Sequence, residues 1–466
     1  MRAVRRYLET VNMQALEETA EYRSPLGELL SEHLGTDAGA CSVVDEQLPD
    51  HRLVDADLAL EELRAASDGR LIGVTGGNQR DHIGLAELVS AQYVRIAPGP
   101  VDYVVRATGP TTTRRVVSFG VWLLRHEGRP LAVLQRAASP HTGRAQAALE
   151  VLGADPDAVS DFLDRVRELM IARSVLRGQV LSFVATEYGA DAGATLLPRS
   201  AVAASDIVLA PGVLGSIVDH VVGIGEHRDA LLAAGRHLKR GILLYGPPGT
   251  GKTLTVRHLL SQTEGTTAVL LTGASIRFIS AAAEIARTFP PALVVLEDID
   301  LVAMERHSSP QPLLFEVLDA LDGLEGDADI AFVMTTNRVE VLERALADRP
   351  GRVDLAVELP RPAPAERRTL FERYALGLPF SRDALHAAAD QAEGTTGSFA
   401  KELMRDAVLR AAVENRAPTD ADLADALETL RDSRNALTRR LLGARTEPSP
   451  EDLDDGSSAG WTAYVP

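Results

Sequence analysis

The sequence predicts an α/β protein with a parallel sheet, a helical C-terminal lid and a mixed α/β domain at the N-terminus. Three observations support this fold class. Continuous apolar runs alternate with helix-compatible segments from about Ser205 onward, which is typical of a parallel sheet covered on both faces. A glycine-rich loop, residues 246–253, joins one such run to a helix-compatible segment. After Pro364 the apolar spacing is helical through about Leu442.

Length and composition indicate an ordinary globular protein. With 466 residues, the chain is expected to form two or three domains. No apolar run is long enough to cross a bilayer, and the basic start, Met1–Arg6, is not followed by the apolar segment of a signal peptide. Cys41 is the only cysteine, which suits a reducing cytoplasm. The net charge of −18 disfavours broad nucleic-acid binding.

Residues 1–200 predict an N-terminal domain, which we expect to bind a substrate or partner. The first 40 residues read as helical, and strand-like runs follow within residues 51–140. Asp155 and Pro156 predict the start of a long helix, as a cap and a first-turn residue. We interpret the glycines of residues 73–77 as a loop, because they lack dinucleotide-binding spacing. The apolar face of the predicted helix comprises Leu26, Leu29, Leu30 and Leu34. The predicted strands are Tyr93–Ile96, Val101–Ala107, Val116–Leu124 and Leu131–Leu134.

The second half of the chain divides into three predicted parts. Residues 205–375 predict a nucleotide-binding α/β domain, and residues 376–443 a helical lid. Residues 444–466 are acidic and rich in Pro, Ser and Gly, so we expect a disordered tail. The predicted strands of the α/β domain are Ile242–Tyr245, Ala268–Leu271, Leu293–Leu296, Ile330–Met334 and Val353–Leu359.

The glycine-rich loop fits the phosphate-binding pattern G-x-x-x-x-G-K-[ST] in its strand–loop–helix context. Glycines allow backbone N–H groups to close around phosphate oxygens, and the following helix N-terminus adds positive potential. Lys252 is expected to reach the β- and γ-phosphates, and the Thr253 hydroxyl to help hold Mg²⁺. The loop residues are Gly246, Pro247, Pro248, Gly249, Thr250, Gly251, Lys252 and Thr253.

Further polar residues follow the predicted strands. Glu297 and Asp298 end an apolar strand, as expected of carboxylates that ligate Mg²⁺ through water and activate an attacking water. Asn337 ends the next strand and offers an amide that can orient this water. Arg349 and Arg352 lie on a later loop, where they would either stabilise transition-state charge at a neighbouring subunit's nucleotide or form surface salt bridges.

In order and spacing these residues resemble the AAA ATPases, in the group that includes proteasomal ATPases and membrane-anchored bacterial AAA proteases. The resemblance covers roughly residues 205–440. It identifies residues 246–253 as a Walker A loop and Glu297–Asp298 as a Walker B pair. Asn337 corresponds to sensor 1, and Arg349 with Arg352 to paired arginine fingers.

The resemblance implies ATP and Mg²⁺ as cofactors, and a homo-oligomeric ring, usually a hexamer, with active sites between subunits. It places Asp206, Ile207 and Val208 near the adenine. The segment Val317–Gly323 resembles the inter-subunit signalling segment. The protease members carry a zinc-binding H-E-x-x-H sequence, which this chain lacks, so we expect no intrinsic proteolysis.

The chain departs from the family pattern in three places. The family's Walker B usually reads Asp-Glu, whereas Glu297-Asp298 is reversed; by position Glu297 would serve the metal and Asp298 the water, with slower hydrolysis. Lys401 lies close to where the lid of the family carries a Gly-Ala pair. It is either a sensor-2-like phosphate contact or an exposed helix lysine. Third, the segment between the second and third predicted strands is short, and its helix is about two turns shorter than usual in the family. Phe278 and Ile279 in this segment resemble the pore loop that grips polypeptide, or else form core under the short helix.

We therefore predict a cytoplasmic ring ATPase that remodels, unfolds or disassembles a protein substrate chosen by the N-terminal domain and pulled through the central pore. The alternative is a slowly hydrolysing, ATP-dependent switch or scaffold in signalling or defence, which the reversed carboxylates and the unusual N-terminal half favour. A nucleic-acid translocase is disfavoured by the acidic balance and by the absence of a basic stretch interleaved with aromatics.

Overall fold

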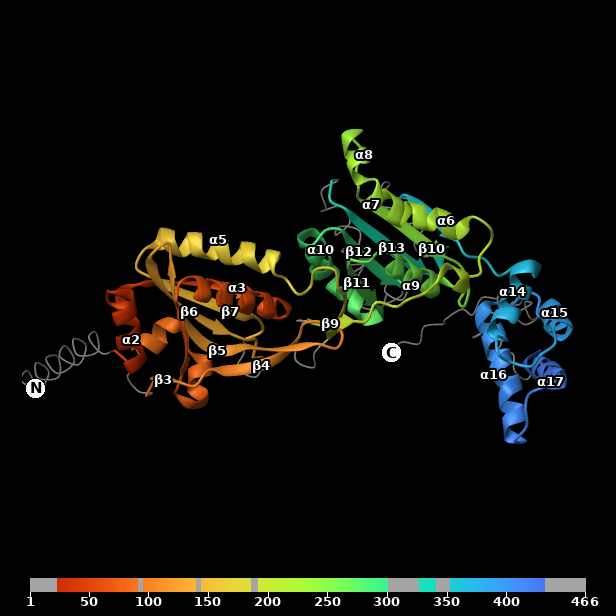
Figure 1. Cartoon of the computed structure of the whole chain (residues 1–466), viewed down its shortest axis with the longest axis horizontal. Coiled ribbons are helices and arrows are strands. Elements are labelled where there is room, and N and C mark those ends of the chain that lie inside the picture. Colours follow the sequence, from red (N-terminus) through yellow and green to blue (C-terminus); the bar gives the residue numbers. More distant parts are fainter. Residues whose placement is uncertain are drawn as a thin grey trace, which may run out of the picture. The chain divides into compact units, whose positions relative to one another are not determined.

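The computed structural model describes residues 23–90, 95–139, 144–185, 192–300, 327–340 and 353–431. The chain divides into two compact units (Figure 1). The first unit contains Met1–Arg199, Gly265–Leu271 and Arg277–Ala292. The second contains Ser200–Glu264, Thr272–Ile276 and Leu293–Pro466.

The first unit is built on a seven-stranded sheet of order β1-β7-β6-β5-β2-β3, with β4 paired to β5. Within the described residues, neighbouring strands of this sheet pair in antiparallel fashion. This confirms the mixed α/β character predicted for the N-terminal region. The strands are β1 (Ser42–Leu48), β2 (Arg70–Val74), β3 (Pro98–Gly99), β4 (Asp102–Ala107), β5 (Thr113–His126), β6 (Arg129–Arg136) and β7 (Ala147–Gly153).

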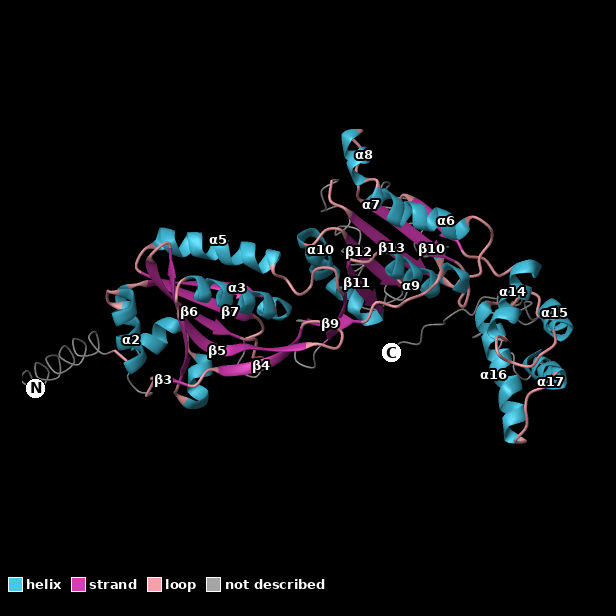
Figure 2. Ribbon diagram, in the orientation of Figure 1, coloured by secondary structure: helices cyan, strands magenta, loops and turns pink. Residues whose placement is uncertain are grey.

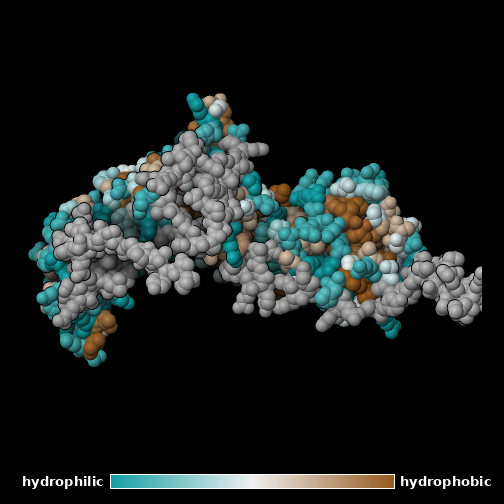
Figure 3. Space-filling model, turned by 180° about the vertical axis from the view of Figure 1, so that it is seen from behind, coloured by the Kyte–Doolittle hydropathy of each residue, from teal (hydrophilic) through white to brown (hydrophobic). Residues whose placement is uncertain are grey.

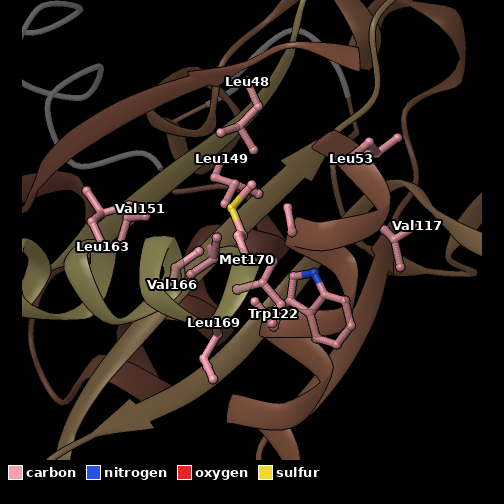
Figure 4. Packing of buried hydrophobic residues seen from close by; sticks show 14 of the residues in the cluster. Leu48, Leu53, Val117, Trp122, Leu149, Val151, Leu163, Val166, Leu169 and Met170 are labelled. Atoms are coloured by element: carbon pink, nitrogen blue, oxygen red, sulfur yellow. The ribbon is translucent and has the colours of Figure 1, made fainter. Parts of the chain in front are cut away.

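Helices cover both faces of this sheet (Figure 2). Alternation along β5 sends Trp122 and Leu124 into one core and Val121 and Leu123 into the other. The first core lies under α3 (Leu53–Ala66) and α5 (Pro156–Ala172), and Figure 4 shows Trp122 and Met170 within it. The second lies under α2 (Pro25–Leu34) and α4 (Leu85–Ser90).

Helix α5 begins as its sequence predicts. Asp155 caps it, because the carboxylate Oδ1 accepts hydrogen bonds from the N–H groups of Asp157 at 3.0 Å and Ala158 at 3.4 Å. Pro156 occupies the first turn, where its missing N–H costs nothing. The predicted apolar stripe of α5 is buried: Phe162, Leu163, Val166, Leu169 and Met170.

The second sheet has seven strands in the order β14-β10-β13-β12-β11-β8-β9. β10 runs parallel to both β13 and β14, and β11 runs parallel to β8. The predicted parallel sheet is therefore confirmed. Its strands are β8 (Val180–Ala185), β9 (Ala192–Leu197), β10 (Arg240–Tyr245), β11 (Thr267–Thr272), β12 (Ala292–Glu297), β13 (Ile330–Thr336) and β14 (Leu355–Glu358).

Two strands of this sheet come from residues that the sequence assigned to the N-terminal domain. β8 and β9 form an antiparallel hairpin, and β8 pairs with β11. The backbone N–H and C=O groups of β8 need hydrogen-bond partners, and the edge of the sheet at β11 provides them on one side of the strand. Both strands nevertheless belong to the first compact unit, which in this part of the chain ends at Arg199.

Short helices precede and follow the strands, and a helical lid completes the described chain. The lid buries Phe371, Phe399 and Leu403 in a core of its own. Figure 3 shows apolar surface at the end of α16, where Leu409 and Val413 are exposed. The helices are α6 (Val213–Val218), α7 (Ile224–Glu226), α8 (Arg228–Ala233), α9 (Lys252–Gln262), α10 (Ile279–Thr288), α14 (Pro364–Tyr374), α15 (Arg382–Gln391), α16 (Gly397–Val413) and α17 (Asp420–Arg431).

Among the residues that the structure describes, no helix combines the length and the apolar character that crossing a membrane requires.

Candidate nucleotide-binding site

The predicted phosphate-binding loop connects the end of β10 to the start of α9, and its glycines are required by its shape. Gly246, Gly249 and Gly251 have φ values of 142°, 80° and 103°, a region that L side chains rarely adopt. A Cβ on Gly246 would lie 2.2 Å from the carbonyl oxygen of Leu359, and one on Gly249 would lie 2.6 Å from Ser398 Oγ. The loop therefore passes close to β14 on one side and to the start of the lid helix α16 on the other.

Lys252 lies at the N-terminus of α9 and is only 6% exposed. Its Nζ donates hydrogen bonds to the carbonyl oxygens of Gly246 at 2.7 Å and Pro247 at 2.9 Å. Burial lowers the pKa of this ammonium, while the charges of Asp298 and Asp300 oppose that shift. A compact cation is thus held inside the loop, at a helix N-terminus that itself favours anions.

Glu297 ends β12 and faces the loop. The Thr253 hydroxyl is hydrogen bonded to its carboxylate. Burial is the largest cause that raises the pKa of Glu297; the bond from Thr253 lowers it and the charge of Asp298 raises it further. Its Oε1 is buried and has no hydrogen-bond partner in the part of the chain that the structure describes. A buried carboxylate oxygen beside a threonine hydroxyl fits Mg²⁺, which prefers oxygen ligands and often takes few from the protein.

Asp298 follows β12 in a left-handed backbone conformation with φ of 52°, which is uncommon for a residue other than glycine. Its N–H donates to Thr335 Oγ1 at 3.0 Å. Its Oδ1 accepts a 2.9 Å hydrogen bond from the side-chain amide of Asn337. Contacts from β13 therefore hold both the backbone and the carboxylate of Asp298, which offsets the conformational strain.

Asp300 is a site residue that sequence reasoning missed. It is 4% exposed, and its Oδ1 accepts hydrogen bonds from Thr336 Oγ1 at 2.9 Å and from the Asn337 N–H at 3.2 Å. These bonds hold the end of β13 and the residue that follows it, Asn337, in place. The sequence contained a signal for this role, because Asp300 is a third acid, two residues after Asp298, at the carboxyl end of a buried strand.

A cavity of about 110 Å³ adjoins the loop. The predicted adenine segment, Asp206–Val208, lines it together with Gly249–Gly251, so the structure brings these two predicted groups together. Leu370, Tyr374 and Gly397 from the lid side complete its wall. Apolar side chains line much of it, as is common in small-molecule sites, and they include Ile207, Val208, Leu254 and Leu370.

Lys401 is exposed on α16 and is not among the residues that line the cavity. Arg349 and Arg352 lie outside the described residues, as does the segment 317–323.

Phe278 and Ile279, the predicted pore-loop pair, are buried. Phe278 is 8% exposed and its ring lies 5.7 Å from that of Phe183 on β8. The ring of His51 in turn contacts Phe183 edge-on at 5.9 Å. This packing favours the second interpretation of Phe278, as a core residue before the short helix α10.

Comparisons with known proteins agree with this geometry. Residues 242–361 match the ATPase family associated with various cellular activities (AAA). The chain is 30% identical over 194 residues to 26S protease regulatory subunit 6A of Caenorhabditis elegans, covering 38% of this chain and 45% of that protein. It is 30% identical over 208 residues to the proteasome-activating nucleotidase of Methanothermobacter thermautotrophicus, covering 41% and 50%.

A third relative is the ATP-dependent zinc metalloprotease FtsH 1 of Sphaerobacter thermophilus, 32% identical over 213 residues, which cover 42% of this chain and 32% of that protein. The chain thus spans about half or less of the length of the curated relatives it matches. The matched residues contain the phosphate-binding loop, the Glu297–Asp298 pair and Asn337. Residues 242–361 of this chain therefore match a domain of the AAA ATPase family.

Proposed function

We propose that the protein hydrolyses ATP, and that it does so in a ring of identical subunits in order to remodel protein substrates. One observation carries the proposal: Lys252, Asp298 and Asn337 come from three separate segments and meet at the carboxyl ends of parallel strands. The charge of Asp298 acts on Lys252, and Asn337 bonds to Asp298. Ligands of parallel α/β sheets bind at this edge.

ATP binding would use the loop and the adjoining cavity. Lys252 would donate to the β- and γ-phosphates in place of the loop carbonyls, and Asp206–Val208 would form one wall around the adenine. Thr253 and Glu297 are suited to hold Mg²⁺, directly and through water. The ion would neutralise phosphate charge as it develops in the transition state.

Asp298 would accept a proton from the attacking water. Its carboxylate is held by Asn337 Nδ2, so the amide and the base act on the same water position. The family pattern has a glutamate where this chain has Asp298. An aspartate is one methylene shorter, which moves the accepting oxygen by about one bond length and is expected to slow the reaction.

The ring and its substrate are inferred from the relatives. Two of them are named as a regulatory subunit of a protease and a proteasome-activating nucleotidase. We propose that Arg349 and Arg352 act on the nucleotide of the next subunit in a cytoplasmic hexamer. Conversion between nucleotide states would bias a two-state subunit interface and so move a protein substrate.

A slowly hydrolysing switch or scaffold is the second candidate. The burial of Phe278 favours it, because a side chain packed against Phe183 does not project to grip polypeptide. In that case nucleotide binding would change assembly or partner binding, and Glu297–Asp298 would set a slow turnover.

The proposal is tested by measuring ATP hydrolysis and particle mass together. Wild-type protein with Mg²⁺ and ATP is expected to form a ring and to release phosphate, while Lys252→Ala abolishes both nucleotide binding and turnover. Arg349→Ala is expected to bind ATP without hydrolysing it, with partial rescue in mixed rings. Full activity in a monomer would contradict the ring. Unfolding of a tagged protein distinguishes the remodeller from the switch.

A further inference from the structure

The segment that leads into the adenine wall, residues 202–206, is held from the side of the phosphate-binding loop. His258 and Ser261 lie on α9, the helix that begins at Lys252. His258 Nδ1 is hydrogen bonded to the carbonyl oxygen of Val202 at 2.8 Å, and Ser261 Oγ donates to the same oxygen at 3.0 Å. His258 is buried, so this attachment is shielded from water.

The same segment is held a second time, from the side of the lid. Arg373 lies in the last turn of α14. Its Nη1 donates to the carbonyl oxygen of Ser205 at 2.6 Å, and its Nη2 pairs with Asp206 Oδ1. The other carboxylate oxygen of Asp206 accepts a 3.1 Å bond from the Ala203 N–H. One guanidinium thus grips a backbone carbonyl and a carboxylate of adjacent residues.

The position of Arg373 matters because its ion-pair partner, Asp206, and its neighbour in the chain, Tyr374, both line the cavity. Asp206 is followed by Ile207 and Val208, which line one wall. Tyr374 follows Arg373 directly and, with Leu370, lines the same cavity. The ion pair therefore ties together two segments that line the cavity, the start of Asp206–Val208 and the end of α14. Arginine suits this task because its planar fork donates in two directions at once.

We propose that Arg373 is a positioning residue for the nucleobase: it preorganises the Asp206–Val208 wall against α14 and so sets the affinity for adenine nucleotides. This inference rests on the proposed function. Without Arg373 the wall must be ordered when the nucleotide binds, and this cost weakens binding. Because the phosphate-binding loop is untouched, the effect falls on the base and not on the phosphates.

The test compares Arg373→Ala with Arg368→Ala. Arg368 lies on the same helix and makes a bidentate pair with Asp390, at 2.9 and 2.7 Å, outside the cavity. Binding of ATP, ADP and inorganic tripolyphosphate is measured by titration calorimetry with Mg²⁺. For Arg373→Ala we expect ATP and ADP to bind more weakly by the same factor, about 5- to 30-fold, with tripolyphosphate unchanged. Arg368→Ala should match wild type for every ligand.

Two further readouts separate positioning from folding. Arg373→Lys keeps one charged donor and should recover part of the affinity, and in Arg373→Ala the KM for ATP should rise more than kcat falls. Unchanged ATP binding in Arg373→Ala would overturn the inference, as would a loss confined to ATP or an equal loss for tripolyphosphate. Wild-type protein that fails to bind ATP would instead refute the proposed function itself.

Discussion

Asn337 and Asp298 are joined side chain to side chain: Asn337 Nδ2 donates a 2.9 Å hydrogen bond to Asp298 Oδ1. The pair is supported from below, because Asp300 Oδ1 accepts from the Asn337 N–H at 3.2 Å and Thr335 Oγ1 accepts from the Asp298 N–H at 3.0 Å. The ends of β12 and β13 thus form one hydrogen-bonded unit, which fixes where an attacking water would meet its base.

This unit predicts different outcomes for the two carboxylates. Asp298→Asn keeps an oxygen for the Asn337 amide but loses the base, so hydrolysis should fall by roughly 10²- to 10⁴-fold while ATP binding persists. Glu297→Gln should weaken the binding of Mg²⁺, and it should leave the position of the attacking water largely unchanged. Single-turnover hydrolysis and nucleotide titration measure both. If Asp298→Asn hydrolyses ATP like wild type while Glu297→Gln is inactive, the two roles are reversed.

Lys401 in the lid would contribute to turnover if it is the sensor-2-like contact. It lies four residues after Gly397, on the same face of α16, and a Cβ on Gly397 would lie 3.4 Å from the Gly249 carbonyl oxygen. The two interpretations of Lys401, a sensor-2-like phosphate contact and an exposed helix lysine, predict different kinetics. Lys401→Ala should lower turnover about fivefold, the equivalent of about 1 kcal/mol. Steady-state kinetics and nucleotide affinity test this; no change in either removes the hypothesis.

Phe278 is expected to act through stability. Truncation to alanine leaves a cavity beside Phe183, and Phe→Ala changes in cores cost about 3–5 kcal/mol. Phe278→Leu refills most of that volume and should cost far less. Chemical denaturation measures the free energy of unfolding of the three proteins. A Phe278→Ala protein with wild-type stability and lost substrate remodelling would restore the pore-loop interpretation.

His51 is expected to make stability depend on pH. Burial, and then the charge of Arg52, lowers the pKa of its imidazole to about 4, whereas Asp50 opposes the shift. The unfolded chain therefore binds a proton before the folded one does, and stability is lost as pH falls from 6.5 toward 4.

The measurement compares the free energy of unfolding of wild type and His51→Gln at pH 7 and pH 5. Wild type should lose about 2 kcal/mol more than the variant over this interval. Burial raises the pKa of Asp55 and Asp57, which gives the opposite pH dependence, but both acids are present in the two proteins. Equal losses in the two proteins would show that His51 titrates normally.

Local patterns predicted much of the fold. The cap at Asp155, the strand before Gly246 and the helix after it depend on neighbouring residues, and the structure confirms each. Residues 73–77 show where such patterns fail. Gly73 and Val74 lie in β2, paired with Pro98 and Gly99, and not in a loop. A Cβ on Gly73 would lie 1.7 Å from the Pro100 carbonyl oxygen, so the glycine permits a close approach between β2 and the segment at Pro100.

The sequence by itself determined that a phosphate-binding loop stands between a strand and a helix and that acids and an amide follow the next strands. Those features could be predicted because each depends on a short motif whose residues lie close together in the sequence. Only the tertiary structure decided that Arg373 grips Asp206, 167 residues away, and that Phe278 packs against Phe183. The reason is physical. Which side chains meet across a sheet or a cavity depends on how distant elements pack, and the hydrophobic periodicity of a sequence does not specify that packing.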